Sequence, residues 1–129
     1  VRKLCPQHEK YELSRDEQTQ LEKFVDTGNV LKNLKEEKIV PPDAMWKNVP
    51  FWKPKETAEC PEGFSGRVGI YEVLPVTSTV KELVMKNATA DEIDKQARSE
   101  GMLSMSEDGI FKSVQGVTTI EEVLRVISE

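Results

Sequence analysis

The sequence has little of what most enzymes need. It contains one histidine, His8, and two cysteines, Cys5 and Cys60, in 129 residues. No glycine is followed by lysine, so the Walker A motif that holds nucleotide phosphates is absent. Motifs for zinc proteases, dinucleotide binding and serine hydrolases are absent as well. We therefore expect this chain, as it stands, to have no catalytic residues and not to be an enzyme.

The charge and hydrophobicity of the chain exclude two further classes of protein. Asp and Glu number 23 against 18 Lys and Arg, which gives a net charge of −5. Because nucleic-acid binding needs a basic face, we expect no nucleic-acid partner. No apolar run approaches the roughly 18 residues of a membrane-spanning helix, and no signal-peptide pattern opens the chain. We expect a cytoplasmic protein without a membrane span.

Helix starts are frequent in this sequence. A capping box places Ser or Thr three residues before Glu, and each side chain satisfies a free backbone N–H of the other residue. We predict helix starts at five such pairs, each of which precedes apolar residues at helical spacing: Ser14/Glu17, Thr79/Glu82, Thr89/Glu92, Ser104/Glu107 and Thr118/Glu121. A further helix is expected over 29–38. The sequence thus predicts two N-terminal helices and four short C-terminal ones.

Strand material lies between the two groups of helices. Residues 49–54 combine aromatic residues with prolines, which is typical of an edge strand. Residues 67–74 are apolar at nearly every position, which predicts a strand buried on both faces. We expect an α+β fold, mainly α, with a compact C-terminal bundle of four helices beside a small antiparallel hairpin or sheet, and an N-terminal helical arm. The expected division is 1–62 for the arm and 63–129 for the strand and C-terminal subdomain.

Cys5, His8 and Cys60 are the candidate metal ligands. Cys5 and His8 have the Cys-x2-His spacing with which two ligands reach one tetrahedral zinc ion, and a distant Cys60 could add a third. Glu59, Glu62 or water would have to be the fourth ligand. Two alternatives are open: a decayed site whose thiols only pack, and a Cys5–Cys60 disulfide. Because the chain has no export signal, we rank the disulfide last.

Two charged residues flank or interrupt the apolar run of 67–74. Arg67 begins it and Glu72 lies within it. Buried charges are usually paired, so the simplest expectation is an internal ion pair or hydrogen bonds to a loop backbone. The alternative is a role at a subunit contact or beside a nucleotide.

Several motifs in this sequence resemble one protein family. GFSGRVGIYEVL at residues 63–74 resembles the segment that follows a cysteine knuckle in the hexameric ATPases of type II secretion and type IV pilus assembly. EGMLSMSEDG at 100–109, GVTT at 116–119 and EEVLRV at 121–126, together with Lys112, resemble later segments of that family in the same order. VRKLC at 1–5 is similar to the exit from its ATPase core.

The resemblance implies that this chain follows a nucleotide-binding core that lies upstream. It would be a non-catalytic C-terminal fragment of a motor at the inner face of the bacterial cell membrane. Its partners would be its own ATPase core, neighbouring subunits of a hexamer and inner-membrane platform proteins, and the isolated chain would be a monomer. ATP and Mg²⁺ would bind only to the full-length parent protein.

The chain departs from this family at the cysteine knuckles. The family usually has four cysteines in two Cys-x2-Cys pairs, whereas His8 stands in one position here and either Gly63 or Thr57 in another. A stand-alone zinc-knuckle module that binds a protein partner is the alternative function.

Overall fold

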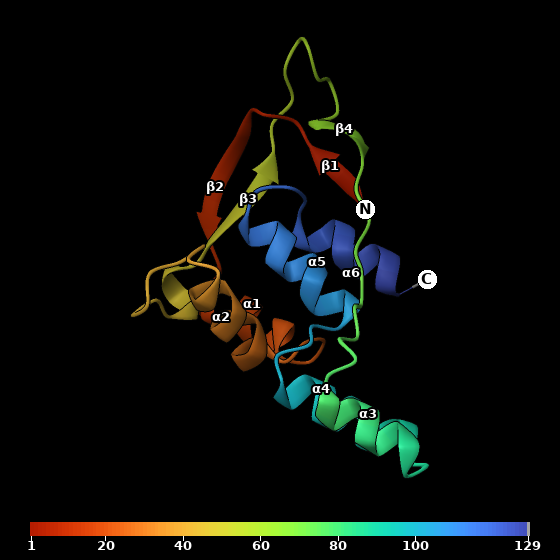
Figure 1. Ribbon diagram of the computed structural model, residues 1–129. Coiled ribbons are helices and arrows are strands. Elements are labelled where there is room, and N and C mark those ends of the chain that lie inside the picture. Colours follow the sequence, from red (N-terminus) through yellow and green to blue (C-terminus); the bar gives the residue numbers. More distant parts are fainter. Residues whose placement is uncertain (129) are drawn as a thin grey trace.

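The computed structural model describes residues 1–128 and has a mainly helical α+β fold, which confirms the expected fold class. Six α-helices and four strands occur in this part of the chain (Figure 1). The strands are β1 Arg2–Leu4, β2 His8–Glu12, β3 Pro50–Pro54 and β4 Phe64–Arg67. The helices are α1 Arg15–Leu21, α2 Thr27–Glu36, α3 Ser78–Met85, α4 Ala90–Ser99, α5 Met105–Val114 and α6 Ile120–Ile127, with a short 3-10 turn at Trp46–Asn48.

The strands form two antiparallel pairs rather than one sheet. β2 pairs with β3, from His8 opposite Pro54 to Glu12 opposite Pro50. β1 pairs with β4, with Arg2 opposite Arg67. The predicted edge strand is therefore present as β3.

The predicted buried strand over 67–74 is wrong. β4 ends at Arg67, where that strand was expected to begin, and residues 68–77 have no regular secondary structure. An extended apolar segment becomes a sheet strand only where another strand offers hydrogen-bond partners. Within residues 1–128 no strand lies beside this segment, so it crosses the surface instead.

The helix N-termini follow the capping prediction in part. Ser14, Thr89 and Ser104 form complete capping boxes with Glu17, Glu92 and Glu107. The other two boxes are wrong by one or two residues. The α3 cap is Thr77, whose side chain accepts the N–H of Val80, and the α6 cap is Thr119, whose side chain accepts the N–H of Glu122. In each case an alternative Thr stands close to the predicted one.

The main hydrophobic core contains residues from both segments of the chain. Val30 and Leu34 of α2 and Phe51 of β3 pack in one cluster with Ile110 of α5 and Val123 of α6, and all five are fully buried. The expected C-terminal bundle is arranged as two helix pairs. α5 packs against α6 and α2, whereas α3 packs against α4, and the α3–α4 pair projects from the rest of the molecule (Figure 1).

None of the helices in the described part of the chain has the length and hydrophobicity needed to span a bilayer.

Candidate functional site

The two cysteines are joined to each other. Cys5 follows β1, Cys60 lies in the loop before β4, and their sulfur atoms form a disulfide across 55 residues of sequence. Both residues are buried. The backbone N–H of Cys5 donates to the Gly63 carbonyl at 3.0 Å, so the antiparallel ladder brings the two loops together. This pairing was the least expected of the three alternatives, because the sequence shows no export signal to an oxidising compartment.

His8 is held by contacts that do not involve Cys60. Its Nδ1 lies 2.8 Å from the Cys5 carbonyl oxygen, which can only accept, so Nδ1 carries the proton of that hydrogen bond. The ring meets Trp52 edge-on, with 4.8 Å between the ring centroids. The Trp52 indole N–H in turn donates to the Val114 carbonyl at 3.0 Å. His8 therefore helps to fix the β2–β3 ladder on the end of α5.

The residues predicted to bind zinc do not fit a zinc ion in this arrangement. Zinc is bound by thiolates, and both sulfur atoms are used in the disulfide. Within residues 1–128, no group of three or more His, Cys, Asp and Glu side chains is placed to hold a metal ion. The zinc role of Cys5, His8 and Cys60 stays a prediction, and it applies only to the reduced chain.

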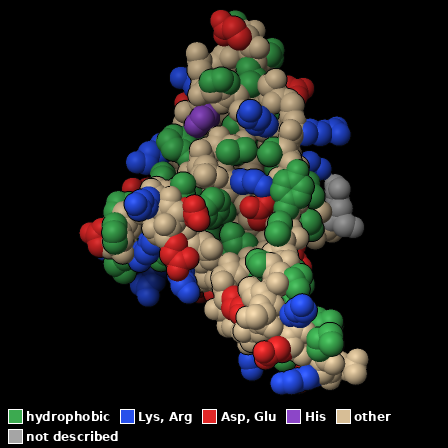
Figure 2. All heavy atoms as spheres, viewed as in Figure 1, with side chains coloured by type: hydrophobic (Ala, Val, Ile, Leu, Met, Phe, Trp, Pro, Cys, Tyr) green, Lys and Arg blue, Asp and Glu red, His purple; other side chains and the backbone are tan. Residues whose placement is uncertain are grey.

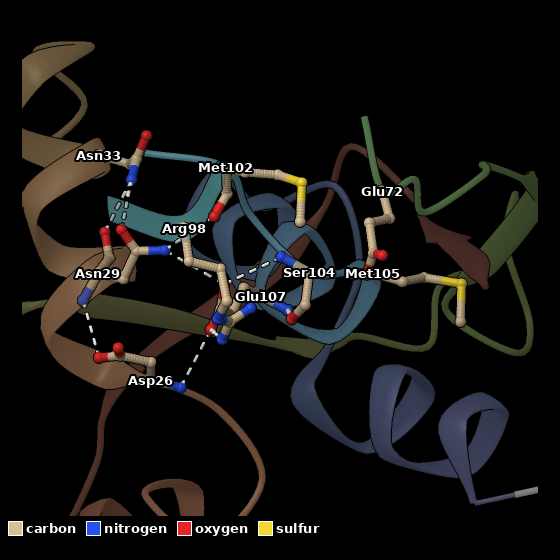
Figure 3. Close-up of polar contacts among 9 residues, drawn as sticks. All are labelled: Asp26, Asn29, Asn33, Glu72, Arg98, Met102, Ser104, Met105 and Glu107. Carbon is tan, nitrogen blue, oxygen red and sulfur yellow. Dashed lines mark hydrogen bonds and ion pairs between the residues drawn. The ribbon is translucent and has the colours of Figure 1, made fainter. Parts of the chain in front are cut away.

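Arg67 and Glu72 lie at the surface and do not pair with each other. Arg67 ends β4 and is exposed. Glu72 is exposed as well, and its Oε2 accepts the backbone N–H of Met105 at 3.3 Å, near the start of α5 (Figure 3). The expected internal ion pair is therefore wrong, because the run that was expected to bury both charges is itself exposed. The hydrogen bond of Glu72 to the backbone agrees with the second half of that expectation.

The segment after β4 exposes several large apolar side chains. Tyr71, Val73 and Val76 are 62%, 69% and 70% exposed, and Leu74 is also exposed. Figure 2 shows hydrophobic side chains on the surface along the connection between β4 and α3. A contiguous exposed apolar patch is typical of an interaction surface. The sequence predicted that residues 67–74 are covered on both faces, and within residues 1–128 Tyr71, Val73 and Leu74 are not covered.

Two residues of α5 hold the start of this segment. Lys112 Nζ donates to the Gly69 carbonyl at 2.9 Å and to Asp108 Oδ2 at 2.6 Å. Asp108 Oδ2 also accepts the backbone N–H of Tyr71 at 2.9 Å, and Lys112 Nζ lies 4.7 Å from the centre of the Tyr71 ring. The segment is thus fixed to α5 at residues 69–71, and the apolar side chains beyond it face outward.

A buried carboxylate, Glu107, joins three helices (Figure 3). Its side chain is fully buried, and its Oε1 accepts from Arg98 of α4 at 2.7 Å and from the backbone N–H of Asp26 at 3.2 Å. Its Oε2 accepts from the backbone N–H of Ser104 at 2.9 Å and from the side-chain amide Nδ2 of Asn29 at 3.4 Å. The sequence predicted the capping box with Ser104 but not the contacts with α2 and α4, which depend on how the helices pack.

The chain matches the family described as Type II/IV secretion system protein over residues 1–125. It is 44% identical to Type II secretion system protein E of Xanthomonas campestris over 79 residues, which cover 61% of this chain and 14% of that protein. It is 35% identical to the Type IV pilus assembly ATPase PilB of Myxococcus xanthus over 125 residues, 96% of this chain and 19% of that protein.

A third relative is the Protein transport protein HofB homolog of Escherichia coli, 36% identical over 87 residues, or 67% of this chain and 19% of that protein. The chain thus matches less than a fifth of the length of each of these relatives.

Proposed function

Because this chain belongs to the type II/IV secretion system protein family, we propose that it is the non-catalytic C-terminal part of a motor ATPase that powers type II secretion or type IV pilus assembly. Its relatives include proteins named as pilus assembly ATPases, of which it matches less than a fifth. The chain has no Walker A motif. The nucleotide site would therefore lie in the remainder of the parent protein, where ATP and Mg²⁺ would bind.

The exposed apolar segment of residues 68–76 is the observation that carries this proposal. Val1 and Val68 exchange backbone hydrogen bonds at 2.9 and 3.0 Å, and beyond Val68 the segment leaves the ladder. Its composition suits a strand with both faces covered, while Val73 and Val76 are mostly exposed. The ATPase core of the parent protein would supply the missing cover, and this part would support that core.

The proposed partners follow from the same assignment. The core would be part of a hexamer, so neighbouring subunits would meet this part at its periphery, and inner-membrane platform proteins would dock on the assembly at the cytoplasmic face. The isolated chain would be a monomer, because most contacts between subunits would be made by the core.

The full-length protein encoded by the gene provides the test. The reading frame should contain a Walker A motif upstream of Val1, and Val73→Asp should lower both ATPase rate and hexamer assembly by burying a charge against the core. Val84→Asp is the matched control, because Val84 is exposed on α3, outside the segment. It should leave both readouts unchanged.

Two results would overturn the proposal. One is a reading frame without a nucleotide-binding motif, which would favour a stand-alone interaction module. The other is a Val73→Asp protein that assembles and hydrolyses ATP like the unmodified protein, which would show that the segment is not covered by the core.

A further inference from the structure

An apolar groove runs between α1 and α6. Its volume is about 270 Å³, and Leu21 and Phe24 on one side face Ile120 and Leu124 on the other. Ile120 and Leu124 lie four positions apart on one face of α6, whereas Leu21 ends α1 and Phe24 lies in the turn that follows it. Phe24 is 50% exposed although its ring lines the groove. None of the lining residues belongs to the segment of residues 68–76.

The charged residues that line this groove are all acidic. Asp16 and Glu17 stand in the first turn of α1, and Glu121 stands in the first turn of α6. All three are exposed. Lys53 Nζ lies 4.7 Å from the centre of the Tyr11 ring but does not line the groove.

Tyr11, which lines the same groove, responds to this environment. Its pKa is raised to about 12, first by burial and then by the negative charges of Glu121 and Glu17. The groove therefore combines poor solvation with negative potential, which favours a ligand that is apolar and positively charged at once.

We propose that this groove binds a cationic amphipathic segment of a partner protein. One or two large apolar side chains of the segment would lie between Leu21 and Leu124, and flanking Lys or Arg would pair with Asp16 and Glu121. Such segments dock on apolar grooves through residues at helical spacing. The inference goes beyond the proposed function, since it concerns neither the ATPase core nor the segment that would contact it.

The size and charge of the groove argue against other occupants. Small-molecule pockets are usually about 300–1,000 Å³ and largely enclose their ligand, whereas this groove is smaller and open at Phe24. Nucleic acids and anionic lipid surfaces would be repelled by the acidic rim. A second copy of this chain, with its net charge of −5, would be repelled as well.

Binding of a defined peptide tests the proposal. The probe is a fluorescein-labelled 14-residue peptide of Leu and Lys with Leu at helical spacing, and its affinity for the full chain is measured by fluorescence anisotropy. Two control peptides have the same composition in scrambled order and Glu in place of Lys. Amide chemical shifts of the ¹⁵N-labelled chain locate the binding surface.

Matched variants distinguish binding in the groove from non-specific attraction of the peptide to an acidic protein. Glu121→Lys is compared with Asp91→Lys, because each acid is exposed and is the second residue of its helix. Phe24→Ala is compared with Met85→Ala, because Met85 is an apolar residue that is 77% exposed and lies on α3, outside the groove. The first control carries the same change of charge, and the second also removes a large exposed apolar side chain.

We expect saturable binding of the peptide. Its affinity should fall about fivefold or more in Glu121→Lys and in Phe24→Ala, and less than about twofold in the controls. Shift changes should centre on Tyr11, Phe24 and Leu124, and added salt should weaken binding. The proposal is overturned if the scrambled peptide binds equally well, if Asp91→Lys and Glu121→Lys have equal effects, or if the shifts lie elsewhere. It is also overturned if the chain dimerises through the groove, or if the rest of the parent protein covers it.

Discussion

Arg2 and Glu122 join the two ends of the chain. Two guanidinium N–H groups of Arg2 donate to Glu122 Oε1 at 2.7 and 3.0 Å, and the Arg2 backbone N–H donates to Oε2 at 2.9 Å. Arg125 adds a hydrogen bond to Oε2 at 3.1 Å. The Glu122 side chain is only 4% exposed. These contacts fix β1 against the start of α6, so β1 and α6 lie on the same side of the molecule (Figure 1).

This contact predicts acid sensitivity. The hydrogen bond from Arg2, followed by that from Arg125, lowers the pKa of Glu122 from 4.5 to about 2, against the opposing effect of burial. A lowered folded-state pKa stabilises the fold above the unfolded pKa, and this contribution is lost as the pH falls from about 5 to about 2. The shift corresponds to at most about 3 kcal/mol of unfolding free energy, because water at the partly exposed Arg2 side chain screens the pair.

Urea unfolding of the wild type and of Glu122→Gln between pH 7 and pH 2.5 measures this contribution. The variant should be less stable at pH 7, and the difference between the two proteins should shrink as the pH falls. Glu121→Gln is the control, because Glu121 is the exposed neighbour of Glu122 and should leave the pH profile unchanged. A constant difference between wild type and Glu122→Gln across this range would contradict the assignment.

Local signals in the sequence predicted the helices well. A capping box concerns four consecutive residues, so Ser104/Glu107 could be identified without any knowledge of the fold. The edge strand β3 was predicted from its prolines and aromatic residues for the same reason. Thr118 and Thr119 are neighbours, and the predicted cap Thr118 is wrong because Thr119 caps α6 in the structure.

Features that depend on distant residues were not predicted. The hydrogen bonds of Glu107 with Asp26 and Arg98 join residues 81 and 9 positions apart, and nothing near Glu107 in the sequence indicates them. The apolar pattern of 67–74 predicted a strand covered on both faces, whereas β4 ends at Arg67 and Val73 is mostly exposed. Local patterns thus predict the helices and caps of one segment, but not which distant residues pack against it.

Replacing Gly109 with alanine should lower the stability of the fold, unlike most glycine-to-alanine changes inside a helix. It lies inside α5, where alanine normally adds up to about 1 kcal/mol of stability over glycine. A Cβ at this position would lie 2.5 Å from Val123 Cγ1, and Val123 is fully buried and cannot move aside. Overpacking typically costs about 1–3 kcal/mol, so Gly109→Ala should be destabilising overall.

Gly28→Ala is the matched control for this change. Gly28 lies in the first turn of α2, and a Cβ there would meet only Asp26 Oδ1 at 3.4 Å. This variant should be neutral or more stable in thermal and urea unfolding. If both glycines gain stability on replacement by alanine, then α5 and α6 do not approach each other as closely as the structure shows.

Removing Arg98 should be more costly than its partly exposed position suggests. The Glu107 side chain is fully buried. Among the ion pairs of residues 1–128, Arg98 provides the one cation paired with it. Breaking a buried pair from one side leaves an uncompensated charge and typically costs about 3–5 kcal/mol. Because other hydrogen bonds to Glu107 remain, Arg98→Ala should cost about 2–3 kcal/mol.

The double variant Arg98→Ala/Glu107→Gln distinguishes this explanation from simple loss of packing. Replacing the carboxylate with an amide removes the uncompensated charge, so the double variant should lose less stability than the sum of the two single changes. Urea unfolding of the four proteins gives the coupling free energy. Strict additivity would show that Arg98 contributes by contact area alone.

The disulfide predicts that reduction lowers stability and changes metal binding together. Closing a 55-residue loop contributes about 4 kcal/mol through the entropy of the unfolded chain. The oxidised chain should show no reactive thiol when unfolded, and reduction or Cys5→Ser/Cys60→Ser should lower the unfolding free energy by up to this amount. Thiol titration in denaturant, followed by urea unfolding of the oxidised and reduced forms, measures both effects.

Zinc binding then depends on the same redox state. A thiolate is the zinc ligand, so the oxidised chain should bind none. If Cys5, His8 and Cys60 are ligands, the chain with free thiols should bind about one zinc ion, because three protein ligands and a water complete a tetrahedral site. His8→Ala should then bind less zinc. A reduced chain without zinc would show that the pair serves only as a cross-link between the loop after β1 and the loop before β4.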